Sequence, residues 1–199
     1  MEELKIKLVG TVPLLMHNNQ GANPLSPYAQ AQKALTSKKK KTDQDYMEIA
    51  RLEWEGGLYM KNGVVVIPAK CLERCFMEGA KKSKNGKLYQ SGAMVDDDFC
   101  ELSYSGQKIK IQVNGTNPLP NPELDKFYKD HCHQDMVRVN MNQVLRTRPI
   151  FEDWSLVVTV LYDSAQIDDR TMLKIMEDAG HVIGLCEQRP RLGRFAVEV

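Results

Sequence analysis

The chain has 199 residues, with 27 lysines and arginines against 26 acidic residues and a formal net charge of +1. This balance excludes any argument from overall charge for a nucleic-acid or membrane partner, so such a partner has to be inferred from where the charges lie. No apolar run is long enough to span a bilayer and the first residues lack the apolar stretch of a signal peptide, so we expect no membrane partner. The length allows a sizeable core, and we expect a single domain, 1–199, with insertions at about 17–57 and 80–100.

The five cysteines are an odd number and include no Cys-x-x-Cys pair. This usage is typical of reduced thiols rather than of a disulfide framework, so we expect a cytoplasmic protein, in the host cell if a phage encodes it. Cys71 and Cys75 lie one helical turn apart, and we interpret them as small core residues.

Local signals define the elements of the first half of the chain. Apolar and charged residues alternate over 4–12 and predict a strand. Helices are predicted at 28–35 and from 42 or 43 to about 55, where two glycines end the second one. A hairpin is predicted at 58–67, around an Asn-Gly turn.

Pro68 begins the third predicted helix, since proline is tolerated in the first turn. We expect the lysine-containing segment 81–87 beyond this helix to be mobile. The second half is predicted to contain four strands and two helical segments, which in chain order are strand 108–113, helical turns 123–130, strand 137–142, strand 154–162, helix 168–183 and strand 195–199. Strand 154–162 is apolar on both faces, so we place it in the centre of the sheet.

This order of elements predicts an α+β fold with helices on one face of a mostly antiparallel sheet. It is close to a ferredoxin-like or RRM-like βαββαβ core carrying helical and loop insertions.

The segment between the last helix and the last strand contains three arginines and a glycine. Arg189 and Arg191 flank a proline, Arg194 follows, and Gly193 would let the backbone approach a ligand closely. The planar guanidinium suits phosphate, which gives an anion-binding interpretation. Taken alone, however, the segment favours a solvated turn whose arginines pair with the protein's own carboxylates.

Two stretches resemble the RAMP superfamily, the CRISPR-associated RNA-binding proteins that include the backbone subunits of crRNA-guided complexes. One is Val-Ile-Pro-Ala at 66–69 with the helix that follows, and the other is the ending from 183 to 195. The chain as a whole also resembles a type of protein encoded by tailed bacteriophages. The resemblance implies the ferredoxin-like fold, binding of single-stranded nucleic acid along the sheet and inserted loops, and polymerisation along the strand. The family's C-terminal loop is richer in glycine, so here the arginine side chains would carry more of the binding.

With the resemblance in place, the basic residues predict a surface that follows a phosphate backbone. The lysines lie in the two insertions and the arginines in strands or at strand ends; the candidates are Lys38, Lys39, Lys40, Lys41, Lys81, Lys82, Lys84, Lys87, Arg138, Arg146, Arg148, Arg189, Arg191 and Arg194. Asn140 and Asn142, on the exposed face of the strand that holds Arg138, would add hydrogen bonds. Tyr89, Tyr104 and Phe195 are candidates either for stacking on bases or for ordinary packing.

Metal and catalytic motifs are weak. A zinc site is one interpretation of His131, Cys132 and His133, but no second ligand pair has suitable spacing. A surface loop is the default interpretation. The three aspartates at 96–98 could bind magnesium, but the default interpretation is a solvated loop. No nucleotide-binding or hydrolase motif is present, so we expect no metal and no cofactor, and nothing argues for an enzyme.

Together these features and the resemblance predict a non-enzymatic phage protein that binds single-stranded DNA or RNA. We expect it to assemble along the strand as a homo-oligomer or filament in replication or recombination. One alternative is an endoribonuclease of the RAMP type with His17 as general acid or base. Another is an anti-defence interaction protein that imitates the backbone subunit of a host CRISPR complex.

Overall fold

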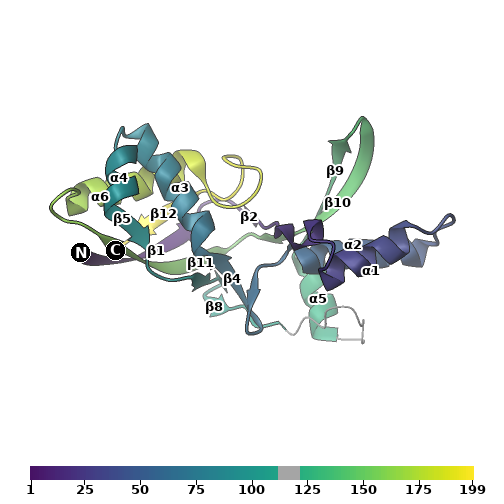
Figure 1. Ribbon diagram of the computed structural model, residues 1–199. Coiled ribbons are helices and arrows are strands. Elements are labelled where there is room, and N and C mark those ends of the chain that lie inside the picture. The colour runs from purple at the N-terminus through teal and green to yellow at the C-terminus, as the bar shows by residue number, and fades with distance from the viewer. Residues whose placement is uncertain (112–121) are drawn as a thin grey trace. The chain divides into compact units, whose positions relative to one another are not determined.

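The computed structural model describes residues 1–111 and 122–199. The chain forms two compact units. Unit 1 comprises 1–15, 60–110 and 151–199, and unit 2 comprises 16–59 and 111–150. Segment 16–59 nearly coincides with the insertion expected at 17–57, whereas 80–100, the other expected insertion, belongs to unit 1. The single domain remains a prediction. Helices and mostly antiparallel sheets confirm the α+β class (Figure 1).

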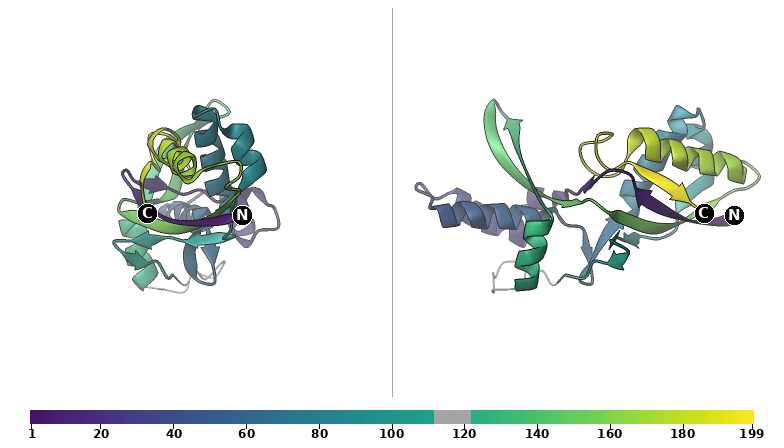
Figure 2. Two further views of the ribbon diagram at one scale, coloured as in Figure 1. Left: turned by 90° about the vertical axis from the view of Figure 1, so that its left-hand side faces the viewer. Right: turned by 180° about the vertical axis from the view of Figure 1, so that it is seen from behind.

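Unit 1 is built on an antiparallel sheet with the strand order β12-β1-β11-β7-β8, and β5 pairs with the other end of β11. Its strands are β1 (Glu2–Gly10), β5 (Ala93–Val95), β7 (Ser103–Tyr104), β8 (Gln107–Lys108), β11 (Trp154–Tyr162) and β12 (Phe195–Glu198). The register sets Ile6 opposite Val158 and Leu8 opposite Leu156, all four buried. Figure 2 shows β1 and β12 side by side from behind.

A smaller sheet in unit 1 contains the predicted hairpin, β3 (Met60–Lys61) and β4 (Val64–Pro68), with β6 (Phe99–Glu101) on the other side of β4. The turn is formed by Asn62 and Gly63, both with positive φ, as an Asn-Gly hairpin requires. The remaining short strand of the unit is β2 (Leu14–Leu15).

Three helices lie on the same face of the main sheet of unit 1: α3 (Ala69–Lys82), α4 (Gly86–Gly92) and α6 (Asp169–Asp178) (Figure 1). The last of them continues as a π-helical turn, η2 (Ala179–Ile183). Asp168 caps α6 by accepting a hydrogen bond from the Thr171 backbone N–H at 2.7 Å. Buried Phe76, Met172 and Met176 fill the layer between these helices and the sheet.

Three sequence predictions for unit 1 need correction. Strand β11 is central, as predicted, but its residues alternate between buried and exposed, and Val157 is 45% exposed. Alternate residues of β11 are therefore buried on one face, and apolar residues such as Val157 also lie on the other face. Segment 81–87 is helical at both ends, since α3 includes Lys82 and α4 begins at Gly86. Of the strand expected at 108–113, only its first residue is in β8, and 112–113 lie outside the described residues.

Unit 2 contains helices and one long hairpin. Its elements are η1 (Asn19–Ala22), α1 (Pro27–Thr36), α2 (Asp43–Gly57), α5 (Pro122–Asp130), β9 (Cys132–Val139) and β10 (Asn142–Phe151), whose last residue belongs to unit 1. Helix α2 begins with a capping box in which Thr42 and Asp45 each accept a hydrogen bond from the other's backbone N–H. Trp54 is the centre of the core: its indole N–H donates to the His131 carbonyl at 2.8 Å, and Phe127 contacts its ring edge-on.

The β9–β10 hairpin turns at Asn140 and Met141, both with positive φ. The strand predicted at 137–142 is therefore wrong in its second half, where the chain reverses. A residue that takes positive φ without being glycine leaves no clear turn signal in the sequence.

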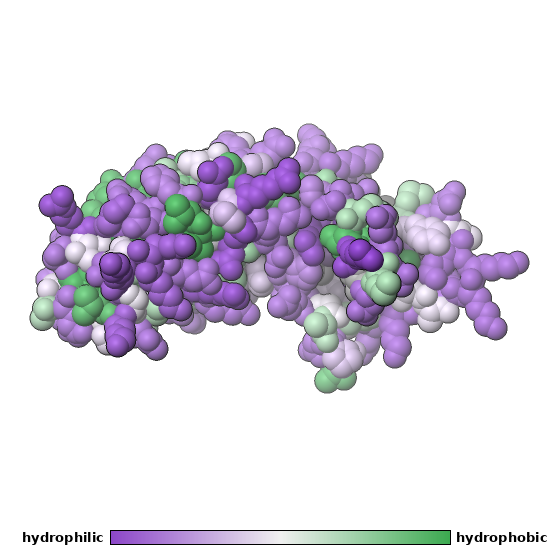
Figure 3. Space-filling model, turned by 90° about the horizontal axis from the view of Figure 1, so that it is seen from above, coloured by the Kyte–Doolittle hydropathy of each residue, from purple (hydrophilic) through white to green (hydrophobic). Residues whose placement is uncertain are grey.

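No helix in the described ranges, 1–111 and 122–199, is both long and apolar enough to cross a membrane. The face in Figure 3 is mostly hydrophilic, with apolar patches interrupted by polar side chains.

Candidate anion-binding pocket

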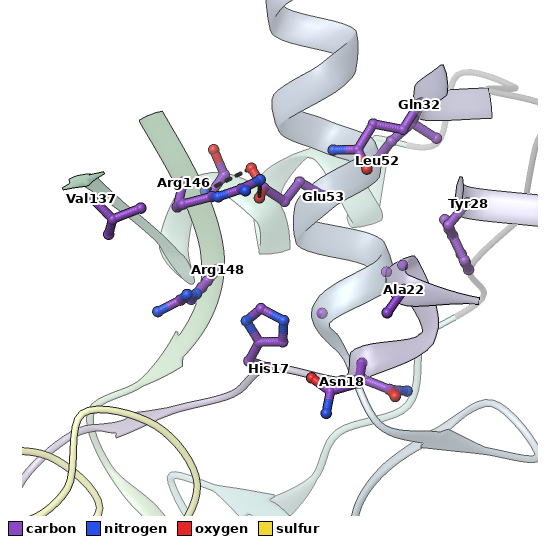
Figure 4. A pocket seen from close by; sticks show the side chains of 15 residues that line it. His17, Asn18, Ala22, Tyr28, Gln32, Leu52, Glu53, Val137, Arg146 and Arg148 are labelled. Atoms are coloured by element: carbon purple, nitrogen blue, oxygen red, sulfur yellow. Dashed lines mark hydrogen bonds and ion pairs between the residues drawn. The ribbon is translucent and has the colours of Figure 1, made fainter. Parts of the chain in front are cut away.

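Unit 2 contains a pocket of about 390 Å³. Its walls come from the segment that holds η1, from α1 and α2, and from the β9–β10 hairpin (Figure 4). His17, Arg146 and Arg148, three of the residues singled out from the sequence, line it together. The other predicted basic residues lie elsewhere.

The strand period explains why both arginines reach this pocket. Arg146 and Arg148 are two residues apart on β10 and therefore point to the same face of the hairpin. The register sets Val137 on that face as well, and Val137 also lines the pocket.

Arg146 is paired inside the protein. Its Nη1 donates to Glu53 Oε1 at 2.8 Å, and the Thr147 backbone N–H donates to Glu53 Oε2 at 3.0 Å. Glu53 lies on α2, so its carboxylate ties this helix to β10, and Figure 4 shows Arg146 reaching toward it. The positive charge of Arg146 is therefore largely offset before any ligand arrives.

Arg148 is different. Its Nε is buried and has no hydrogen-bond partner. A buried guanidinium N–H without a partner costs free energy, and native proteins rarely leave one unexplained. This Nε has almost no solvent-exposed surface, so an anion in the pocket would become its charge-assisted partner once the Arg148 side chain turns Nε toward it.

Local hydrogen bonds fix the segment that carries His17. The Tyr59 hydroxyl donates to the His17 carbonyl at 2.9 Å. The Asn18 side chain donates to the Leu58 carbonyl and accepts the Gln20 N–H, so it caps η1. The backbone around the histidine is thus held in place at the pocket wall.

The other end of the pocket is formed by α1 and α2. Burial, helped by the nearby Glu55 carboxylate, raises the pKa of Tyr28 to about 12, so the phenol stays protonated at neutral pH. Gly57, also on the pocket wall, lets α2 approach β10 closely, since a Cβ there would lie 2.9 Å from Cδ of Pro149.

The four lysines at 38–41 lie between α1 and α2 in unit 2, outside the residues that line the pocket. Lys38 forms an ion pair with Asp45 at 2.6 Å, and the Lys41 ammonium donates to the Lys38 carbonyl at 3.0 Å. Lys39 and Lys40 are exposed. Part of this cluster therefore stabilises the start of α2.

Asp45 makes the stability of this region depend on pH. The hydrogen bond from Lys38, and then the one from the Thr42 N–H, lower its pKa from 3.8 to about 2. The unfolded chain binds the proton first, so this stabilisation is complete above about pH 4 and is lost as the pH falls toward 2. We expect Asp45→Asn to have a lower urea midpoint than the wild type at about pH 5, with a difference that shrinks by about pH 2.5. Asp43→Asn, two residues away in the same first turn of α2, is the control, and an equal pH profile for both variants would contradict this assignment.

The remaining candidates of the hairpin and of unit 1 do not join the pocket. Arg138 is exposed on the face of β9 opposite to the one that Arg146 and Arg148 share across the hairpin. Asn140 is a turn residue, not a strand residue. The four lysines near the end of α3 and in α4 are exposed on unit 1: Lys81, Lys82, Lys84 and Lys87.

Arg189 pairs with the protein's own carboxylate, as the solvated-turn interpretation expected. Its Nη1 is 3.5 Å from Glu78 Oε2, and the same glutamate accepts from Arg74 at 3.1 Å. Arg191 and Arg194 are exposed.

Gly193 has a structural role inside its own loop. Its φ is +76°, and its Cβ position collides with the carbonyl oxygen of Leu185. The Leu185 N–H donates to the Gly193 carbonyl at 2.8 Å, and the Gly193 N–H donates to the Pro13 carbonyl at 2.8 Å. The glycine therefore lets the loop close on itself rather than approach a ligand.

Two of the candidate stacking residues are part of the core. Phe195 is fully buried against Trp154, and Tyr89 is 2% exposed. Neither ring is accessible to a base. Tyr104 is partly exposed.

The His-Cys-His stretch is not a surface loop. His131 is buried, its Nδ1 lies 3.0 Å from the Ile150 carbonyl, and Cys132 begins β9. Of the three aspartates, Asp97 accepts from the Thr159 N–H and Asp98 accepts from the Ala69 N–H through its carbonyl. Over 1–111 and 122–199, no group of three or more His, Cys, Asp or Glu residues is placed to hold a metal ion.

The cysteines are free thiols. Cys75 is fully buried, as expected of a core residue, and burial raises the pKa of its thiol to about 12. Cys71 is only partly buried.

Sequence reasoning missed Glu53, Tyr28 and Gln32, which line the pocket. Each is an ordinary residue of an amphipathic helix, and the partner of Glu53 is 93 residues away in the chain. Only the unusual placement of the two arginines on one strand face gave a local signal.

In comparisons with known proteins, no family model and no curated sequence matches this chain.

Proposed function

We propose that the protein is a non-enzymatic binder of single-stranded nucleic acid and that the unit 2 pocket receives a phosphate of the strand. The observation that carries the proposal is the buried, unpartnered Nε–H of Arg148 in a pocket that also contains His17 and Arg146. A phosphate oxygen is a charge-assisted acceptor that would satisfy this donor.

The sheet of unit 1 supports the finer fold assignment within this proposal. Six elements of this unit, taken in chain order and without the elements between them, give the pattern βαββαβ: β1, α3, β5, β11, α6 and β12. Their strands lie in the sheet in the order β12-β1-β11-β5. A ferredoxin-like core has this chain order and this alternation of edge and central strands. This strand order is compatible with the RAMP-like relationship, which is a hypothesis. Assembly along a strand and a phage role in replication or recombination are further hypotheses of the same proposal.

The affinity for single-stranded DNA and RNA should fall as salt rises, because each neutralised phosphate releases a counterion. Fluorescence anisotropy with labelled oligonucleotides between about 50 mM and about 200 mM salt measures this dependence. The logarithmic slope should become shallower by about 0.7 in Arg148→Met, which is the value for one phosphate of a single strand. Absence of binding to both DNA and RNA at low salt would reject the proposed function.

His17 favours a second candidate function, cleavage of RNA. The structure brings this histidine into one pocket with Arg146 and Arg148, so a general acid or base lies near groups that can hold a phosphate. Incubating the wild type and His17→Ala with structured RNA separates the two functions. Cleavage by the wild type that the variant lacks would favour the endoribonuclease, and intact RNA in both reactions would favour the binder.

A further inference from the structure

We infer that the unit 2 pocket takes one whole nucleotide, the phosphate together with its sugar and base, rather than a phosphate alone. This inference rests on the proposed function and names the ligand of the same site. The ligand class is a phosphorylated nucleoside, either free or as one unit of a strand.

The size of the pocket is the first argument. Sites for small organic ligands span about 300–1,000 Å³, and this pocket measures about 390 Å³. A water molecule occupies about 30 Å³ of liquid, so a phosphate group with five heavy atoms would leave much of the space unfilled.

The charges that line the pocket fit a single phosphate. Glu53 and Arg146 pair with each other, which leaves Arg148 as the uncompensated guanidinium among the three. One net positive charge suits a ligand with a single phosphate group, whose charge is −1 in the diester of a strand and roughly between −1 and −2 in a free monoester. A ligand with several adjacent phosphates would bring more negative charge than these three side chains balance.

The composition of the pocket changes from one end to the other. Arg146 and Arg148 come from β10, whereas Tyr28, Gln32 and Leu52 come from α1 and α2 (Figure 4). Leu52 is apolar, and Gln32 has an amide that can donate and accept, as the edge of a base requires. Ligand sites typically combine apolar walls with a few polar groups in this way.

Calorimetric titration with inorganic phosphate and with deoxynucleoside 5′-monophosphates tests the inference. The monophosphates should bind at least about tenfold more tightly than inorganic phosphate, since only they fill both ends of the pocket. Arg148→Met should weaken both ligands, and Gln32→Met should weaken the nucleotides while leaving inorganic phosphate unchanged. Arg138→Met, on the other face of the hairpin, is the control for a lost charge, and urea unfolding verifies that each variant is folded.

Equal affinities for inorganic phosphate and the monophosphates, or nucleotide binding that neither pocket variant weakens, would overturn the inference. An oligonucleotide titration of the same samples separates this failure from failure of the proposed function. Arg148-dependent oligonucleotide binding without preferential nucleotide binding would overturn the inference and leave the proposed function standing. Nucleotide binding without oligonucleotide binding would overturn the proposed function and support the ligand class.

Discussion

Arg148→Met is expected to lower the affinity for single-stranded nucleic acid about ten- to hundredfold. The buried Nε–H of Arg148 has no partner in the protein, so a bound phosphate would supply its hydrogen bond. Hydrogen bonds to charged groups contribute about 1.5–3 kcal/mol, which corresponds to this range of affinity. Methionine retains an unbranched apolar side chain but removes the charge and the donors. Anisotropy titrations of both proteins at one low salt concentration measure the change.

The same variant should be at least as stable as the wild type without ligand, because it removes a buried donor that lacks a partner. Urea unfolding measures this second consequence. Arg138→Met removes one exposed charge from the same hairpin and should cost much less affinity. Equal losses of affinity in the two variants would show that Arg148 acts only through overall charge, contrary to the pocket assignment.

Gly193→Ala is expected to destabilise unit 1 by about 3 kcal/mol or more. The added methyl group would collide with the Leu185 carbonyl oxygen and lie 2.8 Å from the Leu185 backbone nitrogen, and neither atom belongs to a side chain that can rotate away. The positive φ of +76° adds about 1–2 kcal/mol of strain for a residue with a Cβ. The free energy of unfolding, measured with urea, tests the prediction.

Gly106→Ala is the matched control for this prediction. Its φ is +77°, nearly the same, but nothing lies within 4 Å of the added Cβ. It should therefore show the strain alone, about 1–2 kcal/mol. If the two variants lost equal stability, the close backbone contact would not explain why residue 193 is a glycine. Close approach of a ligand to the backbone would then be the better explanation.

Local signals predicted much of the fold. The alternation of β1, the Asn-Gly turn between β3 and β4, and the cap of α2 depend on neighbouring residues, and the structure contains each of them. The turn at Asn140 and Met141 was missed because neither residue is a glycine. The apolar composition of both faces of β11 did not mean burial of both, because valine is favoured in strands even where its side chain is exposed, as Val157 shows.

The candidate site was predictable only in part. His17, Arg146 and Arg148 were singled out one by one, but nothing in the sequence brings 17 and 148 together. The pairing of Arg146 with Glu53 depends on a contact between β10 and α2. For Phe195 the sequence left stacking on bases and ordinary packing open, and packing against Trp154 buries the ring. Both the Arg146–Glu53 pair and the burial of Phe195 depend on contacts between residues far apart in the chain. Such contacts cannot be inferred from a single sequence.

Photo-cross-linking tests the central claim, that the pocket of unit 2 receives the strand. Single-stranded oligonucleotides with a photoreactive base analogue would be irradiated with the protein, and the modified peptides identified by mass spectrometry. We expect cross-links to peptides from 17–32 and 137–148, which carry pocket walls, and their loss in Arg148→Met. Cross-links confined to peptides of unit 1, unchanged in that variant, would contradict it.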